Sequence, residues 1–483
     1  MNTKLKNLNR YLIVVTTLVF MIGYWSCDTP KPCESKLLSG KVCNGVDTLH
    51  LKNDSITDGI KLLVRCNELI LNTRVQNANE IRYYLKGLCF ERKDSCPCSQ
   101  FELWGNPSVE GIDVGVAVAN APKIDGVGLN EALMANILFS HELPTDANEK
   151  DTLISNSNLD INCLSENSPI IRVAIVDSGV DPNTNVSKNK LHTKGWHGYN
   201  LWDRCLESNY PLGLEYHLVR GVSEPMDSNG HGTAVNGVLV GASKPNFNMP
   251  LPLSFVNVDV MQGQNKTGNL YDALCGLYYA LEQEPRVINI SWGFRYLTEP
   301  LYMDMEAAII KAFNDYFTDC NNRYPGGVIV VAGAGNDSIE INSFDKFYPA
   351  CLARDHMNVV SVGSHKDSGV NDLSEFSNYA DISSNYISLF APGEMVITPY
   401  PKYLQATSSG VLPTGYARLS GTSFAAPYIS RIVALIRVVH PYIDAGEVKI
   451  RLIEMTSPRT SILRPGIEYH KLEVSNVVSK ICD

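Results

Sequence analysis

Short runs rich in valine and isoleucine recur in the second half of the chain and constrain its fold more than any other feature. Five such runs cover residues 170–177, 253–261, 286–292, 327–333 and 357–364. Strands that are buried on both faces of a parallel sheet have this near-continuous apolar pattern. Residues 269–284, 301–317 and 423–439 instead carry apolar side chains at helical spacing. We therefore expect an α/β fold, a mostly parallel sheet with helices on both faces and functional residues at the carboxyl ends of its strands.

The composition is that of an ordinary globular protein. Hydrophobic residues make up 44% and charged residues 19% of the 483 residues, which argues against a disordered or fibrous chain. The formal net charge is −10, whereas proteins that bind nucleic acid usually present a basic surface. We therefore expect no nucleic-acid partner.

The first 26 residues have the order of a secretory signal. Three basic residues, Lys4, Lys6 and Arg10, precede an apolar run over residues 11–25, which is shorter than the ~20 residues needed to span a bilayer. The following Ser26-Cys27 resembles a bacterial lipoprotein cleavage site. We expect a signal peptide over residues 1–26, lipid attachment at Cys27, and an extracytoplasmic protein that is membrane-anchored through this lipid, or secreted. Ordinary signal cleavage and a short uncleaved anchor are the alternatives.

The cysteines point to the same compartment. Of the 13 cysteines, seven lie in residues 27–155. Removing Cys27 as the lipid acceptor leaves twelve, which is enough for six disulfides and suits an oxidising compartment. The alternative is that several cysteines are buried free thiols.

Composition divides the chain into three parts. Residues 28–155 form a smaller cysteine-rich domain, in which residues 101–104 and 132–139 are expected to supply two ordered elements. The polar stretch over residues 141–160 has the composition of a linker. The α/β domain is expected over residues 160–483.

Three polar residues stand where the pattern places ends of strands and starts of helices. Asp177 ends the first buried run, His231 lies between Gly230 and Gly232 at the start of a helical segment, and Ser423 starts another. Flanking glycines allow the backbone to approach another element closely. Each residue alone has an ordinary structural explanation, such as a loop cap for the aspartate.

Together the three segments resemble the catalytic motifs of the subtilisin-like serine protease family. The segments VAIVDSGVD, DSNGHGT and RLSGTSFAAP follow in the order Asp, His, Ser, and the resemblance extends over about residues 168–480. It implies a subtilisin-like fold and a catalytic triad of Asp177, His231 and Ser423. The segment GVIVVAGAGND resembles the oxyanion segment of the family and gives that role to Asn336.

The same resemblance indicates where substrate binds. INISWG resembles the strand beside the first specificity pocket, so Ser291, Trp292 and Gly293 are expected to form one wall. Residues 265–271 are expected to border the substrate as an extended edge to which a peptide adds as a strand. Phe294 stands where the family usually has glycine, so it is expected to narrow or reshape the pocket and restrict specificity.

Other positions also depart from the family pattern. Tyr428 and Arg431 replace residues that are usually histidine and a small residue, and an arginine on a buried helix needs a partner or a route to solvent. Asp227 precedes His231 by four residues, and capping the turn before the helix is its expected role.

The chemistry implied is hydrolysis of a peptide bond in a protein or peptide substrate. A serine hydroxyl needs a neighbouring base to become a nucleophile, and the histidine supplies it while the aspartate orients the ring. No step needs a metal or another cofactor, and we expect none. Residues 183–226 contain His192, His197, Cys205 and His217, but their spacing is looser than that of structural zinc sites. A surface insertion is therefore favoured.

The sequence leaves two alternatives open, one for residues 28–155 and one for the activity. Residues 28–155 have the position and size of the removable propeptide that many subtilisin-like proteases carry, but their cysteines equally suit an accessory domain that stays. The alternative to an endopeptidase is a catalytically silent subtilisin-like binding protein at the cell surface.

Overall fold

The computed structural model describes residues 38–42, 46–53, 56–96, 98–108, 110–123, 128–140, 164, 168–181, 198–200, 214–218, 227, 229–241, 252–261, 267–366, 373–404 and 415–482. The predicted signal peptide, Cys27, the linker and most of the 183–226 insertion lie outside these residues.

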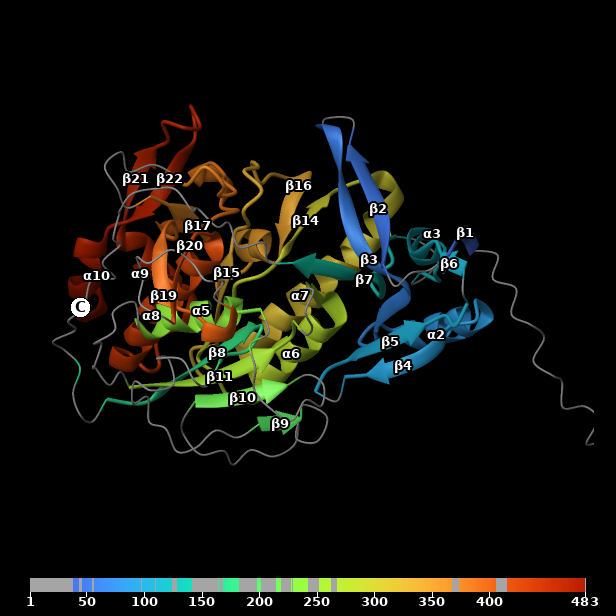
Figure 1. Cartoon of the computed structure of the whole chain (residues 1–483), viewed down its shortest axis with the longest axis horizontal. Coiled ribbons are helices and arrows are strands. Elements are labelled where there is room, and N and C mark those ends of the chain that lie inside the picture. The colour runs from blue at the N-terminus through green and yellow to red at the C-terminus, as the bar shows by residue number, and fades with distance from the viewer. Residues whose placement is uncertain are drawn as a thin grey trace, which may run out of the picture.

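A ten-stranded sheet forms the centre of the larger part of the chain (Figure 1). All its strand pairs are parallel except the one at the β21 edge. This confirms the predicted α/β fold with a mostly parallel sheet. In spatial order the strands are β21 (Thr456–Thr460), β22 (Glu468–Leu472), β18 (Leu389–Pro392), β17 (Val359–His365), β15 (Ile329–Gly333), β13 (Val287–Ile290), β8 (Ile171–Asp177), β11 (Leu253–Asp259), β10 (Leu214–Leu218) and β9 (Gly198–Asn200).

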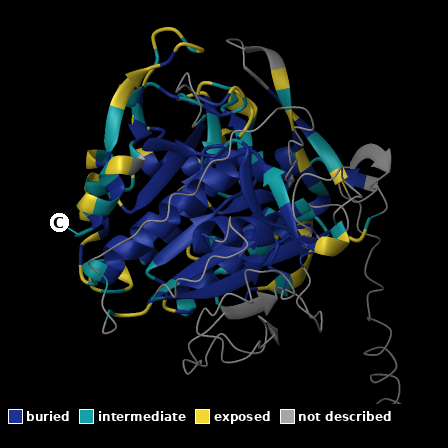
Figure 2. Cartoon of the chain, turned by 60° about the vertical axis from the view of Figure 1, so that its left-hand side comes forward, coloured by how far each residue is buried: buried dark blue, intermediate teal, exposed yellow. Residues whose placement is uncertain are grey.

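Helices cover both faces of this sheet, as predicted. Successive side chains of a strand point to opposite faces, and β8 shows the consequence. Val173 and Ile175 join the apolar cluster of α5 (His231–Val240) and α8 (Thr422–Val439). Ala174 and Val176 join the cluster of α6 (Leu270–Glu282) and α7 (Met303–Asn322). Figure 2 shows the central strands of the sheet as buried.

Two further helices, α9 (Ala445–Glu454) and α10 (Val474–Cys482), follow α8 along the chain. Among the described residues α8 is the one helix long and apolar enough to cross a membrane, but 94% of the tested window is buried inside the protein. It is a core helix. Before α10, His470 to Leu472 belong to β22. These residues pair with β21 and β18 at the sheet edge, and the ring of Tyr469 packs against Phe390 at 5.2 Å.

A second, six-stranded sheet contains most of the N-terminal region, by which we mean the described residues from Leu38 to Ser140. It consists of β12 (Thr267–Asn269), β7 (Leu133–Ser140), β3 (Ile56–Asn72), β5 (Phe101–Gly105) and β4 (Glu91–Ser95), with β2 (Val46–Asn53) paired to β3. The predicted elements at residues 101–104 and 132–139 are therefore present as β5 and β7. The N-terminal region also contains α2 (Ala78–Gly87), α3 (Val114–Ala119) and the pair β1 (Leu38–Val42) and β6 (Glu110–Ile112).

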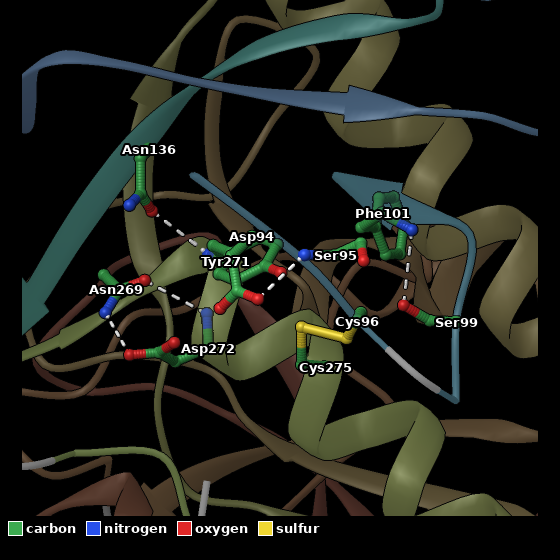
Figure 3. Close-up of a disulfide and its surroundings, with 10 residues drawn as sticks. All are labelled: Asp94, Ser95, Cys96, Ser99, Phe101, Asn136, Asn269, Tyr271, Asp272 and Cys275. Carbon is green, nitrogen blue, oxygen red and sulfur yellow. Dashed lines mark hydrogen bonds between the residues drawn. A yellow bond between two sulfur atoms is a disulfide. The ribbon is translucent and has the colours of Figure 1, made fainter. Parts of the chain in front are cut away.

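The N-terminal region is joined to the larger part of the chain, which contains the ten-stranded sheet, by strand pairing, apolar packing and a disulfide. The strand β12 belongs to the larger part, so the second sheet bridges the two. One apolar cluster runs from the N-terminal region into α6 and α7. A disulfide joins Cys96 to Cys275 on α6, and beside it the side chain of Asn136 accepts a hydrogen bond of 3.1 Å from the backbone N–H of Tyr271 (Figure 3).

Six cysteines of the described residues are disulfide-bonded: Cys66, Cys89, Cys96, Cys98, Cys275 and Cys482. Cys320 and Cys351 are free thiols buried in the core, and burial raises the pKa of both. The twelve cysteines other than Cys27 therefore do not all pair, and the alternative of buried thiols holds for these two residues. Both lie in the apolar cluster of α6 and α7, where a cysteine packs as a small apolar side chain.

Candidate active site

Asp177 and His231 meet at the carboxyl end of β8. His231 is the first residue of α5, and its Nδ1 atom lies 2.7 Å from Oδ1 of Asp177. Both side chains are only 1% exposed. The carboxylate also accepts a hydrogen bond of 2.8 Å from the backbone N–H of Ser178. The carboxylate therefore holds one nitrogen of the imidazole ring and leaves the other to face another partner.

The glycines around His231 let α5 approach β8. A Cβ atom on Gly232 would lie 2.1 Å from the backbone oxygen of Gly179. Gly230 has a φ of 86°, in the left-handed region that favours glycine. The expected close backbone approach at His231 is therefore present.

Asp227 forms hydrogen bonds to the start of α5 and to Ser178, the residue after Asp177. Its carboxylate accepts hydrogen bonds from the backbone N–H groups of Gly230 at 2.7 Å and Thr233 at 2.8 Å, and from the Ser178 hydroxyl at 2.9 Å. Burial raises the pKa of Asp227 to about 6, although these hydrogen bonds oppose the shift. The expectation that Asp227 caps the turn before the helix is confirmed.

Ser423 is the second residue of α8 and is hydrogen-bonded to the segment after β13. Its hydroxyl donates to the backbone oxygen of Ser291 at 3.1 Å, and the Ser291 hydroxyl donates to the backbone oxygen of Ser423 at 3.0 Å. The ring of His231 lies 5.7 Å from the ring of Phe424, the residue after the serine. The Ser423 proton has to turn away from the Ser291 carbonyl before a base can remove it.

Asn336 follows β15 and lies beside the start of α8. Its side-chain oxygen accepts hydrogen bonds from the backbone N–H of Thr422 at 2.9 Å and from the Thr422 hydroxyl at 3.1 Å. Because a backbone N–H can only donate, this contact identifies the oxygen of the amide. The exposed amide nitrogen therefore remains a donor beside Ser423.

A cavity of about 410 Å³ opens at Ser423. The predicted residues Ser291, Trp292 and Gly293 line it together with Asn336. Further walls of the cavity were not predicted from the sequence. They come from Phe347 and from two strands of the N-terminal region, at residues 60–63 and 138–139.

The N-terminal region occupies the edge that was predicted to bind substrate. Within the described part of residues 265–271, β12 pairs with β7, so that Gly268 lies opposite Phe139 and Asn269 opposite Leu138. The ring of Phe139 stacks on Trp292, with centroids 4.7 Å apart and planes 15° apart. The indole N–H of Trp292 donates to the backbone oxygen of Val176 at 2.9 Å, which holds the ring in place.

The departures from the family pattern are all accommodated in the core. Tyr428 and Arg431 are both 2% exposed. The Arg431 guanidinium lies against Gly241, where a Cβ atom would come within 2.2 Å of it. Gly241 directly follows the last residue of α5, and a cation is favourable near the last carbonyl groups of a helix. Phe294 is buried with its ring 5.9 Å from that of Tyr348, and it lines the cavity at Ser423.

Within the parts of the chain that the structure describes, no group of three or more His, Cys, Asp or Glu side chains is placed to hold a metal ion. Cys27, His192, His197 and Cys205 lie outside those parts.

Known proteins have similar sequences. The chain is 30% identical to the major intracellular serine protease of Bacillus subtilis (strain 168) over 297 residues, covering 60% of this chain and 76% of that one. It is 26% identical to subtilisin-like protease 1 of Plasmodium falciparum (isolate 3D7) over 303 residues, covering 59% of this chain. The match spans only 41% of the length of the Plasmodium relative.

The fold is also known. Fervidolysin from Fervidobacterium pennivorans, a keratinolytic enzyme related to subtilisin, matches with a TM-score of 0.58 over 92% of this chain and 65% of that one, at 14% identity. This likeness shows the fold alone. The family model of the subtilase family matches residues 170–471, which is more than half of the chain. The chain therefore belongs to the subtilase family.

Proposed function

We propose that the chain is a serine endopeptidase that hydrolyses peptide bonds in a protein or peptide substrate through an acyl-enzyme on Ser423. The observation that carries the proposal is the buried contact of 2.7 Å between His231 and Asp177 at the carboxyl end of β8. Membership of the subtilase family supports it.

In the proposed reaction Nε2 of His231 takes the Ser423 proton as the hydroxyl attacks the carbonyl carbon of the substrate. The imidazolium then gives this proton to the leaving amine. Asp177 holds the ring through Nδ1 and stabilises its charged form. Water attacks the ester in a second round, in which His231 again serves as base and then as acid.

The negative charge of the tetrahedral intermediate falls on the former carbonyl oxygen. In the proposal, the amide nitrogen of Asn336 donates to this oxygen, because the amide oxygen is held by Thr422. The start of α8 adds the positive end of the helix dipole on the same side.

We propose that the N-terminal region covers the substrate edge until it is displaced. An extended peptide binds such an edge by adding a strand, and β7 already pairs with β12 in this way. The Cys96–Cys275 disulfide would keep the region attached after cleavage of the connecting segment. This arrangement combines the two roles considered for residues 28–155, that of a cleaved propeptide and that of a domain that stays.

We also propose an extracytoplasmic location, with a lipid on Cys27 as the membrane anchor. The disulfide-bonded cysteines support an oxidising compartment. Growth with a labelled fatty acid tests the anchor. Label should enter the wild type, and a Cys27→Ser variant should stay unlabelled. Equal labelling of both would exclude Cys27 as the acceptor.

A fluorophosphonate probe tests the activity, because it reacts with activated serines. The purified chain is labelled as isolated, and again after the disulfides are reduced and the N-terminal region is removed by limited proteolysis. We expect one adduct per chain in at least one condition and none in Ser423→Ala. Folded protein that takes up no label in either condition would refute the proposal and favour the catalytically silent binding protein.

A further inference from the structure

We propose that Phe347 closes the pocket for the substrate residue that precedes the cleaved bond, so that the enzyme prefers a small residue there, glycine, alanine or serine. The inference rests on the proposed protease activity and names the substrate class of that same site.

Two glycine segments flank the nucleophile and define this pocket. Gly293 lies two residues after Ser291, whose backbone oxygen accepts the Ser423 hydroxyl. On the other side, the backbone N–H of Gly335 donates to the Thr422 hydroxyl at 3.1 Å. A peptide whose carbonyl group lies at Ser423 therefore directs the side chain of that residue into the gap between the two glycines.

The ring of Phe347 fills this gap. A Cβ atom on Gly293 would lie 2.3 Å from Cε1 of the ring, and one on Gly335 would lie 2.6 Å from Cδ2 and Cε2. These atoms belong to opposite edges of the ring, so the ring spans the distance from one glycine to the other. A branched or aromatic substrate side chain would clash with the Phe347 ring, whereas a methyl or hydroxymethyl group is short enough to avoid it.

The strand that carries Phe347 is held in place and cannot easily withdraw the ring. Phe347 belongs to β16 (Asp345–Tyr348), which pairs with β14 (Phe294–Leu297) so that Phe347 lies opposite Arg295. Two residues earlier, the carboxylate of Asp345 accepts a hydrogen bond of 2.8 Å from Nε of Arg295. The next residue, Tyr348, is buried and donates its hydroxyl to Glu306 at 2.8 Å.

Phe294, which the sequence suggested as the residue that narrows the pocket, does not fill the gap. Its ring packs toward Tyr348 at 5.9 Å, and none of its atoms is among the three nearest to a Cβ on Gly335, whereas two atoms of the Phe347 ring are. The restriction of specificity is therefore assigned to Phe347.

Two peptide anilides that differ only in the residue before the cleaved bond, alanine in one and phenylalanine in the other, test the assignment. Fluorophosphonate labelling first counts the active sites in each sample, and kcat/KM is then measured per active site. We expect the wild type to favour alanine by at least about tenfold. In Phe347→Gly the ratio should shift toward phenylalanine by at least about 100-fold, within the range that a single apolar pocket can discriminate.

A matched control is Phe344→Gly, since Phe344 lies three residues earlier and is 51% exposed. Its ratio should equal that of the wild type. A milder variant, Phe347→Val, should shift the ratio in the same direction if Phe347→Gly does not fold. A wild type that cleaves after phenylalanine as fast as after alanine, or an unchanged ratio in labelled Phe347 variants, would overturn the assignment. Absence of labelling in the wild type would instead refute the protease proposal itself.

Discussion

The contact between Phe139 and Trp292 offers a quantitative test of whether the N-terminal region controls access to Ser423. Phe139 is 4% exposed and stacks on Trp292 at 4.7 Å, on the strand that occupies the substrate edge. Truncation of a buried phenylalanine to alanine typically costs about 3–5 kcal/mol. When β7 leaves β12 this contact is lost, so Phe139→Ala should make that opening easier by about 3 kcal/mol, at the low end of this range.

A change of about 1.4 kcal/mol is tenfold in an equilibrium constant, so about 3 kcal/mol corresponds to roughly a 100-fold larger open fraction. If the probe reacts only with the open form, Phe139→Ala should label at Ser423 about 100-fold faster than the wild type. The assay follows the adduct by intact mass over time with a bulky fluorophosphonate.

The control is Tyr83→Ala, because Tyr83 lies in the same region but is 81% exposed, and its labelling rate should equal that of the wild type. The opposite outcome is a Phe139→Ala protein that is folded, has a lowered unfolding temperature and still labels at the wild-type rate. That result would mean that the N-terminal region does not cover the site.

Three further predictions follow from named contacts. Replacing Asn336 by alanine should lower kcat by about 10²–10³ with little change in KM, which is the usual loss when one oxyanion donor is removed from a serine protease; steady-state kinetics would contradict the assignment if kcat were unchanged. Protein cleaved between β7 and β8 should run as one species on a gel without reductant and as two species with it, because Cys96–Cys275 joins the two parts; separation without reductant would contradict the disulfide. Burial lowers the pKa of His365 from 6.5 to about 4, so the folded state favours the neutral ring. The contribution of the neutral ring to the free energy of unfolding is complete above about pH 6.5. It is lost as the pH falls through about 4, by up to about 3 kcal/mol at 1.36 kcal/mol per pKa unit. Urea unfolding at several pH values should show that the free energy of unfolding depends less on pH in His365→Gln than in the wild type. An identical pH dependence in the two proteins would contradict this.

Much of the fold and the site could be predicted from local sequence. The apolar runs that became β8, β11, β13, β15 and β17 are buried on both faces, and that burial leaves a signature in the residues themselves. His231 and Ser423 stand at helix starts, where the glycines that precede them mark the turns. Local sequence therefore indicated the candidate catalytic residues and the elements that carry them.

The parts that were missed depend on contacts between distant segments. Cys96 pairs with a cysteine 179 residues away, and no spacing rule indicates such a pairing. Phe347 enters the pocket only because β16 folds back against β14. Residues 470–472 lie just before α10 and form part of β22, because they pair with β21 at the edge of the sheet. A pairing with a separate strand leaves no local pattern in the sequence.

The acyl-enzyme that we propose Ser423 forms with a peptide substrate can be trapped and weighed. The chain is mixed with an activated peptide ester ending in alanine, the reaction is stopped with acid, and the protein is weighed and digested. We predict a mass increase equal to the acyl group, located on the peptide that contains Ser423 and absent from Ser423→Ala. Turnover of the ester with no adduct on that peptide, or turnover by Ser423→Ala at the wild-type rate, would contradict the claim.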